Sequence, residues 1–310
     1  MQNFYTSNFR GYVYRLLWIQ AALLVVFAST SIALVKYVVE PNDNFISRLH
    51  LTRNGTAKNA AFGDSHIVWG IVGSPDFITL GADGETIADM ELRVRYYFQN
   101  KRPGKVIIQG DPHSFSPYKL ERGTHAYLQD MGASFWRRFI AHHRQYLGQY
   151  WRKVIANRGL HVFHPKHEIK WGWVVGKDRW SSVDPVVRVH QALSRVQRQT
   201  PIEELQRHEF AETYRRTLSF LKRSGAEICV VTMPVSYDYH MHAERTRSTA
   251  SAIRFFQDVA KQNDARYVNF FGLYAQPQFD DYFTDEDHLN EVGAPRFTKK
   301  LLSACFDRPD

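Results

Sequence analysis

The sequence predicts a three-layer α/β domain with a parallel five-stranded sheet, a helical insertion and an N-terminal transmembrane helix. Three observations carry this prediction: short apolar runs alternate with helical patterns, a Gly-Asp-Ser triplet follows the first run, and an uncharged apolar stretch lies near the amino terminus. With 310 residues, of which 44% are hydrophobic, the chain can bury a substantial core.

The uncharged stretch runs from Leu16 to Val35, and about twenty residues suffice for a helix to cross a bilayer. Arg10 and Arg15 precede it, which favours a cytoplasmic amino terminus. We therefore expect a cytoplasmic tail over residues 1–15 and a transmembrane signal anchor over residues 16–39. The protein would then be a single-pass protein of the cell membrane, with the rest of the chain extracytoplasmic, in the periplasm.

A cleaved signal peptide is the competing interpretation, but the apolar run exceeds the ~7 to 15 residues typical of one. A buried core helix is disfavoured because no charge interrupts any face of the stretch. Residues 40–58 are mostly polar and lack strong periodicity, which predicts a tether. The folded domain is then expected over residues 59–310.

Five short apolar runs predict the strands of the sheet: 59–62, 76–80, 105–109, 228–233 and 266–270. Helical periodicity lies between them over 87–97, 210–221 and 247–262, and a closing helix is expected over 292–305. Strand, helix and strand at these spacings indicate parallel pairing through right-handed crossovers. The carboxyl-end loops of strands one, two, three and five should therefore meet at one edge of the sheet.

Residues 119–200 are interpreted as an insertion, or cap, on this domain. Within it, residues 134–157 predict one long helix whose apolar face is aromatic and is interleaved with basic residues. Core packing of that face is the default interpretation, and a groove or a membrane-surface contact is the alternative. The tryptophans that follow could hold sugar rings or form a satellite core: Trp171, Trp173 and Trp180.

A new helix is predicted to start at the end of the insertion. Thr200 is the expected N-cap, Pro201 the first helical residue and Glu203 the third. The helical pattern then continues to Gly225.

The net charge of +9 is unevenly distributed. Residues 119–226 contain twenty Lys and Arg against nine Asp and Glu, a local excess larger than that of the whole chain. Such a surface favours anionic partners, which for an exported protein means membrane headgroups or an acidic polymer before nucleic acid. A solvated basic face without a partner is the alternative. No nucleic-acid partner is expected.

The two cysteines, Cys229 and Cys305, are predicted to be small core residues. A disulfide between them is possible in an oxidising compartment, but the sequence leaves the pairing open. No metal site is predicted, because the histidine clusters lack a convincing ligand spacing; His240 and His242, for example, have only Glu244 nearby. No cofactor is expected.

Two short stretches could together supply nucleophilic chemistry. Ser65 follows the first predicted strand within Gly63-Asp64-Ser65, and Asp285 lies three residues before His288. A carboxylate that holds an imidazole fixes its tautomer, and the imidazole can then accept the proton of a serine hydroxyl. The joint occurrence predicts Ser65 as nucleophile, His288 as base and Asp285 as its orienting group.

An acyl-transfer serine also needs hydrogen-bond donors for the developing oxyanion. The backbone N–H groups of Ser65 and Gly84 are the expected first two, although Gly84 could instead serve only as a turn glycine. The third donor is open, because Gln109, Asp111 and His113 all lie at or after the end of the third strand. Asp111 and His113 are the two candidates for this third donor.

The sequence resembles the SGNH, or GDSL-like, hydrolase and acyltransferase superfamily. The resemblance rests on Gly63-Asp64-Ser65, on residues 81–86 (GADGET) and on residues 285–288 (DEDH). It implies a flavodoxin-like α/β/α fold, the same three catalytic roles, and Gly84 as an oxyanion donor. In two places the sequence departs from the family pattern: His66 replaces the usual leucine, and residues 109–113 (QGDPH) replace the Gly-x-Asn-Asp block.

The anchor and the insertion resemble those of the membrane-anchored branch of that superfamily, which includes the D-alanine-transfer and polysaccharide O-acetylation proteins. This implies an extracytoplasmic serine O-acyltransferase that moves an acetyl or similar group onto an envelope glycan or polymer. It also implies a multi-spanning membrane O-acyltransferase as partner. Two alternatives stay open: a carbohydrate or ester hydrolase with the same triad, and a non-catalytic envelope assembly protein.

Overall fold

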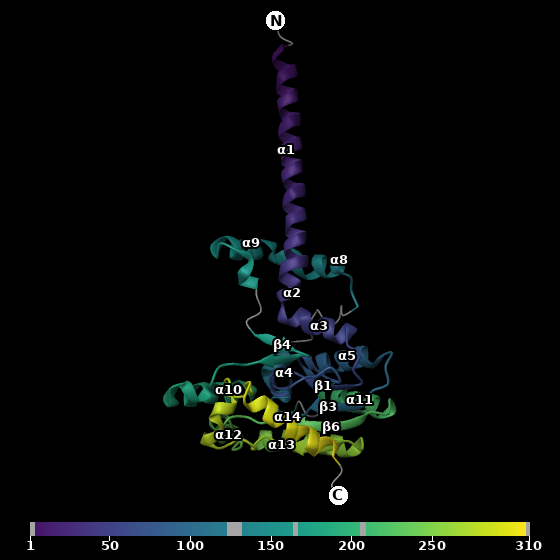
Figure 1. The fold of residues 1–310 in the computed structure, drawn as a ribbon, viewed down its shortest axis with the longest axis vertical. Helices are drawn as coiled ribbons and strands as arrows, with labels where there is room; N and C mark the ends of the chain where they lie inside the picture. Colours follow the sequence, from purple (N-terminus) through teal and green to yellow (C-terminus); the bar gives the residue numbers. More distant parts are fainter. Residues whose placement is uncertain (1–3, 123–131, 164–166, 205–208, 308–310) are drawn as a thin grey trace. The chain divides into compact units, whose positions relative to one another are not determined.

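The computed structural model describes residues 4–122, 132–163, 167–204 and 209–307. The chain divides into two compact units, a smaller one of residues 1–47 and 132–165 and a larger one of residues 48–131 and 166–310. The larger unit contains the sheet and its helices (Figure 1). The boundaries of tether, domain and insertion drawn from the sequence stay predictions.

The larger unit is built on a five-stranded sheet whose strands are all parallel. Its spatial order is β2-β1-β3-β6-β7, with these bounds: β1 (Asn59–Gly63), β2 (Phe77–Gly81), β3 (Lys105–Gln109), β6 (Glu227–Thr232) and β7 (Arg266–Asn269). This is the flavodoxin-like order, and the predicted fold class is confirmed. Ala61 of β1 pairs with Thr79 on one side and Ile107 on the other. The strand order reverses at β1, so the crevice beside its carboxyl end is where ligands bind in such sheets.

Helices cover both faces of the sheet because side chains of successive strand residues point to opposite faces. Ala60 and Phe62 pack with the first set: α5 (Ile87–Phe98), α11 (Glu209–Arg223) and α13 (Arg247–Gln262). Ala61 packs with the second set: α4 (Ser65–Gly70) and α14 (Gly293–Phe306). Strands buried on both faces explain why the sequence shows continuous apolar runs here instead of an alternation.

Shorter elements complete the larger unit. They are η2 (Pro112–Phe115), α6 (Pro117–Arg122), β4 (Glu168–Lys170), β5 (Trp173–Val175), η6 (Trp180–Ser182), α10 (Pro185–Gln199), α12 (Tyr237–Ala243) and η8 (Pro277–Tyr282). Strands β4 and β5 form an antiparallel pair. Trp173 and Trp180 are buried in the second core and Trp171 is 48% exposed, so two of the three tryptophans pack as core residues.

Cys229 of β6 and Cys305 of α14 form a disulfide, with their Cα atoms 5.6 Å apart. The bond joins a central strand to the last helix and answers the question of pairing that the sequence left open.

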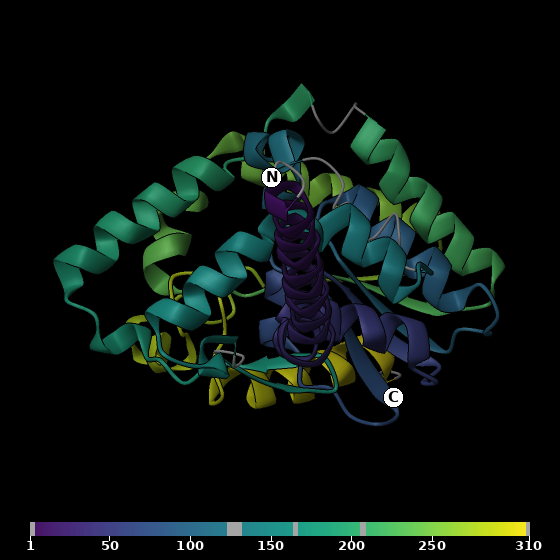
Figure 2. The ribbon, with the colours of Figure 1, turned by 90° about the horizontal axis from the view of Figure 1, so that it is seen from above.

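The predicted helix start at Thr200 is wrong. Thr200 instead ends α10, and its hydroxyl donates to the carbonyl of Val196, one turn earlier in that helix. The side chain that would have capped a new helix is therefore used by the preceding one. The later helix, α11, begins at Glu209, and Figure 2 shows α10 (teal-green) and α11 (green) running in different directions.

The predicted single helix over 134–157 is helical but interrupted. Its segments are α8 (Phe135–Arg138), the π-helical η3 (Phe139–His143), the 3-10 turn η4 (Arg144–Tyr146) and α9 (Leu147–Ala156), followed by η5 (Leu160–Phe163). Ser134 caps the first segment by accepting from the N–H of Arg137. His143, at the end of the π-helical turn, reaches the hydroxyl of Tyr150 at 2.9 Å, so these two residues lie on one face as their spacing indicates.

The amino-terminal part of the chain is helical from residue 4. Helix α1 (Phe4–Leu34) continues through η1 (Val35–Val39) and α2 (Glu40–Asn42), and the run Gly11–Asn42 is long and apolar enough to cross a membrane. Helix α3 (Asn44–Asn54) follows, so part of the predicted tether is also helical.

Replacing both cysteines, Cys229→Ser with Cys305→Ser, is expected to lower the free energy of unfolding by about 2–4 kcal/mol, because the cross-link no longer restricts the unfolded chain. Denaturant unfolding of the purified chain in detergent measures this loss. The matched control is Ser303→Ala at an exposed position of α14, which should change little. Equal stability of oxidised and reduced wild-type protein would contradict the contribution of the bond.

Candidate functional site

Ser65 is the first residue of α4 and directly follows the turn at the end of β1. The turn is held by Asp64, the N-cap of α4, whose carboxylate accepts from the N–H of His66 at 3.0 Å. Gly63 is required here, because a Cβ at this position would lie 2.1 Å from the Oε1 atom of Gln109. The first N–H groups of a helix have no partner within it, so the N–H of Ser65 is available to a ligand.

A cavity of about 390 Å³ brings Ser65 together with three other residues singled out from the sequence. Gly84, Asp285 and His288 line this cavity with it, and we call it the Ser65 cavity. Six further residues complete its wall: Trp69, Asp83, Tyr118, Arg195, Arg198 and Gln199. The carboxyl-end loops of β1 and β2 and the loop before α14 therefore meet there.

Asp285 holds the ring of His288. The Nδ1 atom of His288 lies 2.8 and 2.9 Å from the two carboxylate oxygens of Asp285, and the same carboxylate accepts from the backbone N–H of His288 at 2.9 Å. The other ring nitrogen, Nε2, is buried and has no hydrogen-bond partner among the described residues. Because Nδ1 is committed to the carboxylate, Nε2 is the atom that can exchange a proton with a ligand or with Ser65.

The pKa of His288 is raised above its ordinary value. Burial by itself would lower it, but the carboxylates of Asp285 and Asp287 favour the charged ring and outweigh burial. Both carboxylates lie close to Nδ1, with Asp287 Oδ1 at 3.2 Å. These two carboxylates would therefore stabilise an imidazolium that forms at His288 during a reaction.

The three candidate oxyanion residues lie in different places. Gly84 lines the Ser65 cavity and has a φ of +75°, a left-handed conformation that also makes it a turn glycine. Asp111 and His113 are 2% and 3% exposed and do not line that cavity. The oxyanion role of all three stays a prediction.

A buried network of charges lies beneath the Ser65 cavity, and Asp64 is its first centre. Its carboxylate receives hydrogen bonds from Gln109 Nε2 at 2.8 Å, His113 Nε2 at 2.6 Å and Lys119 Nζ at 2.6 Å. Burial by itself would raise the pKa of Asp64, but the Lys119 ammonium and His113 hold it well below its ordinary value. Asp64 is therefore a buried anion whose charge is matched by Lys119.

His66 is the second centre of the network. Its Nδ1 lies 2.9 Å from Asp111 Oδ2, and its Nε2 lies 3.2 Å from Asp287 Oδ2. Burial opposes a charge on this ring, but hydrogen bonds to the two carboxylates outweigh burial and raise the pKa of His66 well above its ordinary value. His66 is therefore a buried cation.

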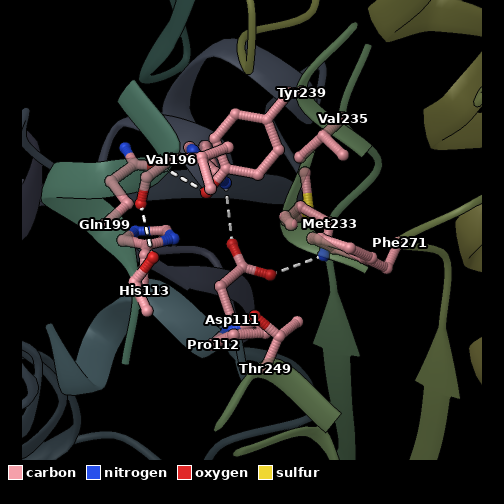
Figure 3. Close-up of a pocket in the computed structure, with 13 residues that line it drawn as sticks. Asp111, Pro112, His113, Val196, Gln199, Met233, Val235, Tyr239, Thr249 and Phe271 are labelled. Carbon is pink, nitrogen blue, oxygen red and sulfur yellow. Dashed lines mark hydrogen bonds and ion pairs between the residues drawn. The ribbon is translucent and has the colours of Figure 1, made fainter. Parts of the chain in front are cut away.

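Asp111 accepts from three donors. Its Oδ2 accepts hydrogen bonds from Gln109 Nε2, at 2.7 Å, and from His66 Nδ1. Its Oδ1 accepts a hydrogen bond from the backbone N–H of Met233 at 2.6 Å. Figure 3 shows Asp111 and its bond to Met233 at an internal cavity of about 10 Å³, room for about one water molecule. Asp111 therefore links His66, Gln109 and the backbone of Met233 within the network.

The loop that carries His288 is held from α10. Arg195 Nε donates to Glu286 Oε1 at 2.7 Å, and its Nη2 lies 3.5 Å from Asp287 Oδ1. Gln199 Nε2 donates to Asp287 Oδ2 at 2.8 Å. The insertion predicted from the sequence therefore supplies side chains that fix the acidic loop.

Four residues of this site were missed by the sequence analysis as individual contributors: Lys119, Arg195, Gln199 and Asp287. One feature of the sequence could have indicated this network. The two departures from the pattern of the resembled family contain His66 and Asp111, and these two residues contact each other directly. A buried histidine in place of leucine requires a counter-charge, and the altered loop after β3 supplies it.

Among the described residues, two buried groups have ligand atoms close enough to hold a metal ion: Asp64, His66 and His113, and His66, Asp287 and His288. The sequence spacing did not reveal either group. In the first, the ammonium of Lys119 already lies 2.6 Å from the Asp64 carboxylate. In the second, the charged ring of His66 lies beside Asp287. These cations balance the carboxylates, so we assign no metal role to either group.

The fold and the site define a flavodoxin-like α/β protein with serine, histidine and aspartate side chains at one cavity. No family model and no curated protein matches the chain. Among solved structures it is similar to a protein of Bacteroides fragilis NCTC 9343 that is provisionally assigned as an acylhydrolase, at a TM-score of 0.42 and 11% identity. That match covers 83% of this chain and 93% of the other. A likeness this distant carries no argument, so the reaction has to be inferred from the site.

His66→Leu, which restores the usual residue of the resembled family, is expected to destabilise the protein by about 3–5 kcal/mol, because it leaves two buried carboxylates without their shared cation. Denaturant unfolding measures the loss. Adding Asp111→Asn should cost less in the His66→Leu background than in the wild type, since the two residues are coupled. His190→Leu, at an exposed position of α10, is the matched control. A stable His66→Leu variant would contradict the assigned charge.

Proposed function

We propose that the protein is an extracytoplasmic serine O-acyltransferase of the SGNH type that modifies an envelope glycan or polymer. The observation that carries this proposal is the shared cavity of Ser65 and His288, in which Asp285 holds Nδ1 and Nε2 has no hydrogen-bond partner in the part of the chain that the structure describes. A serine becomes a useful nucleophile when an oriented base takes its proton.

The reaction would proceed in two steps. Ser65 Oγ attacks the acyl carbonyl carbon of a donor ester while its proton moves to His288 Nε2. The bond to the donor oxygen then breaks, and that oxygen takes the proton from His288. An acceptor hydroxyl attacks the acyl-enzyme, gives its proton to His288, and releases Ser65 Oγ, which regains a proton. The N–H groups of Ser65 and Gly84 are the proposed donors to the oxyanion formed in each step.

An anionic carbohydrate is the proposed acceptor. Arg198 is exposed and lines the Ser65 cavity, and no ion pair or hydrogen bond of its side chain occurs among the described residues. Trp69 lines the same cavity with its ring centroid 5.5 Å from that of His288. An aromatic face beside the base can hold a sugar ring, and the guanidinium can pair with a carboxylate or phosphate group on it.

The proposed location is the cell membrane, with α1 as a single span, its amino terminus cytoplasmic and the larger unit in the periplasm. The length and composition of α1 support the span, and the disulfide of Cys229 and Cys305 fits an oxidising compartment. A multi-spanning membrane O-acyltransferase is the proposed partner, which would deliver the acyl group from the other side of the membrane.

Ser65→Ala is expected to abolish covalent labelling of the purified chain by a fluorophosphonate and to lower polymer acylation in cells by ~10²-fold or more, because no acyl-enzyme can form. Gel fluorescence and release of polymer-bound acyl groups measure the two effects. Ser74→Ala, a half-buried serine outside the cavity, is the control.

Retained polymer acylation in the Ser65→Ala variant at normal protein level would contradict the proposal. Release of free acid from an acylated glycan by the purified wild-type chain, without transfer, would assign the same residues to hydrolysis. Absence of labelling in folded wild-type protein would favour a non-catalytic assembly role.

The rate of fluorophosphonate labelling is expected to rise with pH and to level off above the raised pKa of His288, because only a neutral ring accepts the proton of Ser65. Asp285→Asn should move the midpoint to lower pH, since it removes the nearest charge that raises this pKa, and should lower the plateau. Labelling rates across a pH series measure both. Asp83→Asn, at the cavity rim, should keep the wild-type midpoint; an upward shift with Asp285→Asn would contradict the assignment.

A further inference from the structure

Within the smaller unit, residues 132–163 pack against the carboxyl-terminal end of α1. Trp151 Nε1 donates to Ser31 Oγ at 2.9 Å, and its ring centroid lies 6.1 Å from that of Phe27. Arg138 makes two hydrogen bonds to Glu40, at 3.0 and 2.9 Å, and both residues are almost fully buried. The segment is therefore fixed to α1 at the place where its apolar stretch ends.

If α1 crosses the bilayer, the end of its apolar stretch places this contact at the membrane interface. Ser31 lies four residues before Val35, the last residue of the apolar stretch, which is about 6 Å along a helix. Interfacial helices place their apolar face about 5–10 Å into the boundary between headgroups and acyl chains. If α1 crosses the bilayer, Trp151 and α9 lie within that boundary.

The segment carries exposed apolar side chains together with a strongly basic composition. Trp136 and Ile140 are each 56% exposed, and Ile155 is 72% exposed. Tyr146 and Leu160 are also exposed. Residues 132–163 contain six Lys and Arg and no Asp or Glu. Arg138 pairs with Glu40, and the other five cations are exposed: Arg137, Arg144, Arg152, Lys153 and Arg158.

We propose that this interfacial surface, formed by the exposed apolar and basic side chains of residues 132–163, binds the anionic phospholipid surface beside α1. The occupant follows from continuity with the span and from charge, because large apolar side chains enter the boundary region and Lys and Arg are attracted to anionic headgroups. The surface would hold the smaller unit against the membrane, independently of chemistry at Ser65. The proposal rests on α1 crossing the bilayer.

The test uses the full chain in phosphatidylcholine vesicles with or without phosphatidylglycerol. Ile155→Cys is labelled with an environment-sensitive fluorophore, and the native cysteines do not react because they are paired. Gln149→Cys is the matched control, exposed on the same helix and about 120° around it from Ile155. A blue shift and a loss of fluorescence with brominated lipid are expected at position 155 and not at position 149.

The loss at position 155 should be larger when phosphatidylglycerol is present, and Arg152→Gln with Lys153→Gln should remove that difference. Equal quenching at the two positions, or none at either, would overturn the proposal. Equal quenching at position 155 in vesicles with and without phosphatidylglycerol would overturn the assignment to anionic lipid. Cross-linking of two copies through the Ile155→Cys variant, in place of quenching, would assign the surface to a second copy of the chain. None of these readouts depends on labelling of Ser65, so the two proposals fail separately.

Discussion

The site depends on one buried histidine held between two carboxylates. His66 lies 2.9 Å from Asp111 and 3.2 Å from Asp287, which belong to the loops after β3 and before α14. Uncompensated charges in a protein interior are strongly destabilising, so the ring must carry a proton to keep both carboxylates buried. Asp287 also lies 3.2 Å from Nδ1 of His288. The charge on His66, the residue next to the proposed nucleophile, therefore influences the pKa of the proposed base, His288, through Asp287.

This arrangement gives a physical meaning to the two departures from the resembled family pattern. A leucine at position 66 would leave Asp111 without the cation that it contacts at 2.9 Å. Gln109 adds a second link, because it bonds both Asp64 and Asp111. His66 and Asp111, which lie at these two departures, therefore belong to one buried network, and the two motifs considered separately do not reveal this contact.

The sheet and the position of Ser65 could be predicted because they depend on local sequence. Strands buried on both faces give continuous apolar runs, and the contact of Asp285 with His288 spans only three residues. The partner of Asp64 could not be predicted in the same way, because Lys119 lies 55 residues away and nothing in its local sequence indicates a buried ion pair. At Thr200 the local signal was ambiguous, since its hydroxyl can serve the helix before it as well as one after it.

Helix α10 makes the insertion part of the site. Arg195, Arg198 and Gln199 are spaced at i, i+3 and i+4, which places them on one face of the helix. Arg195 and Gln199 hold the loop that carries Asp287. Arg198 lines the Ser65 cavity and has no ion pair among the described residues. An anionic substrate drawn to Arg198 would therefore contact the helix that also positions the carboxylate beside His288. Under the proposed function one helix would serve both purposes, so a shift of α10 would change substrate binding and the environment of the proposed base together.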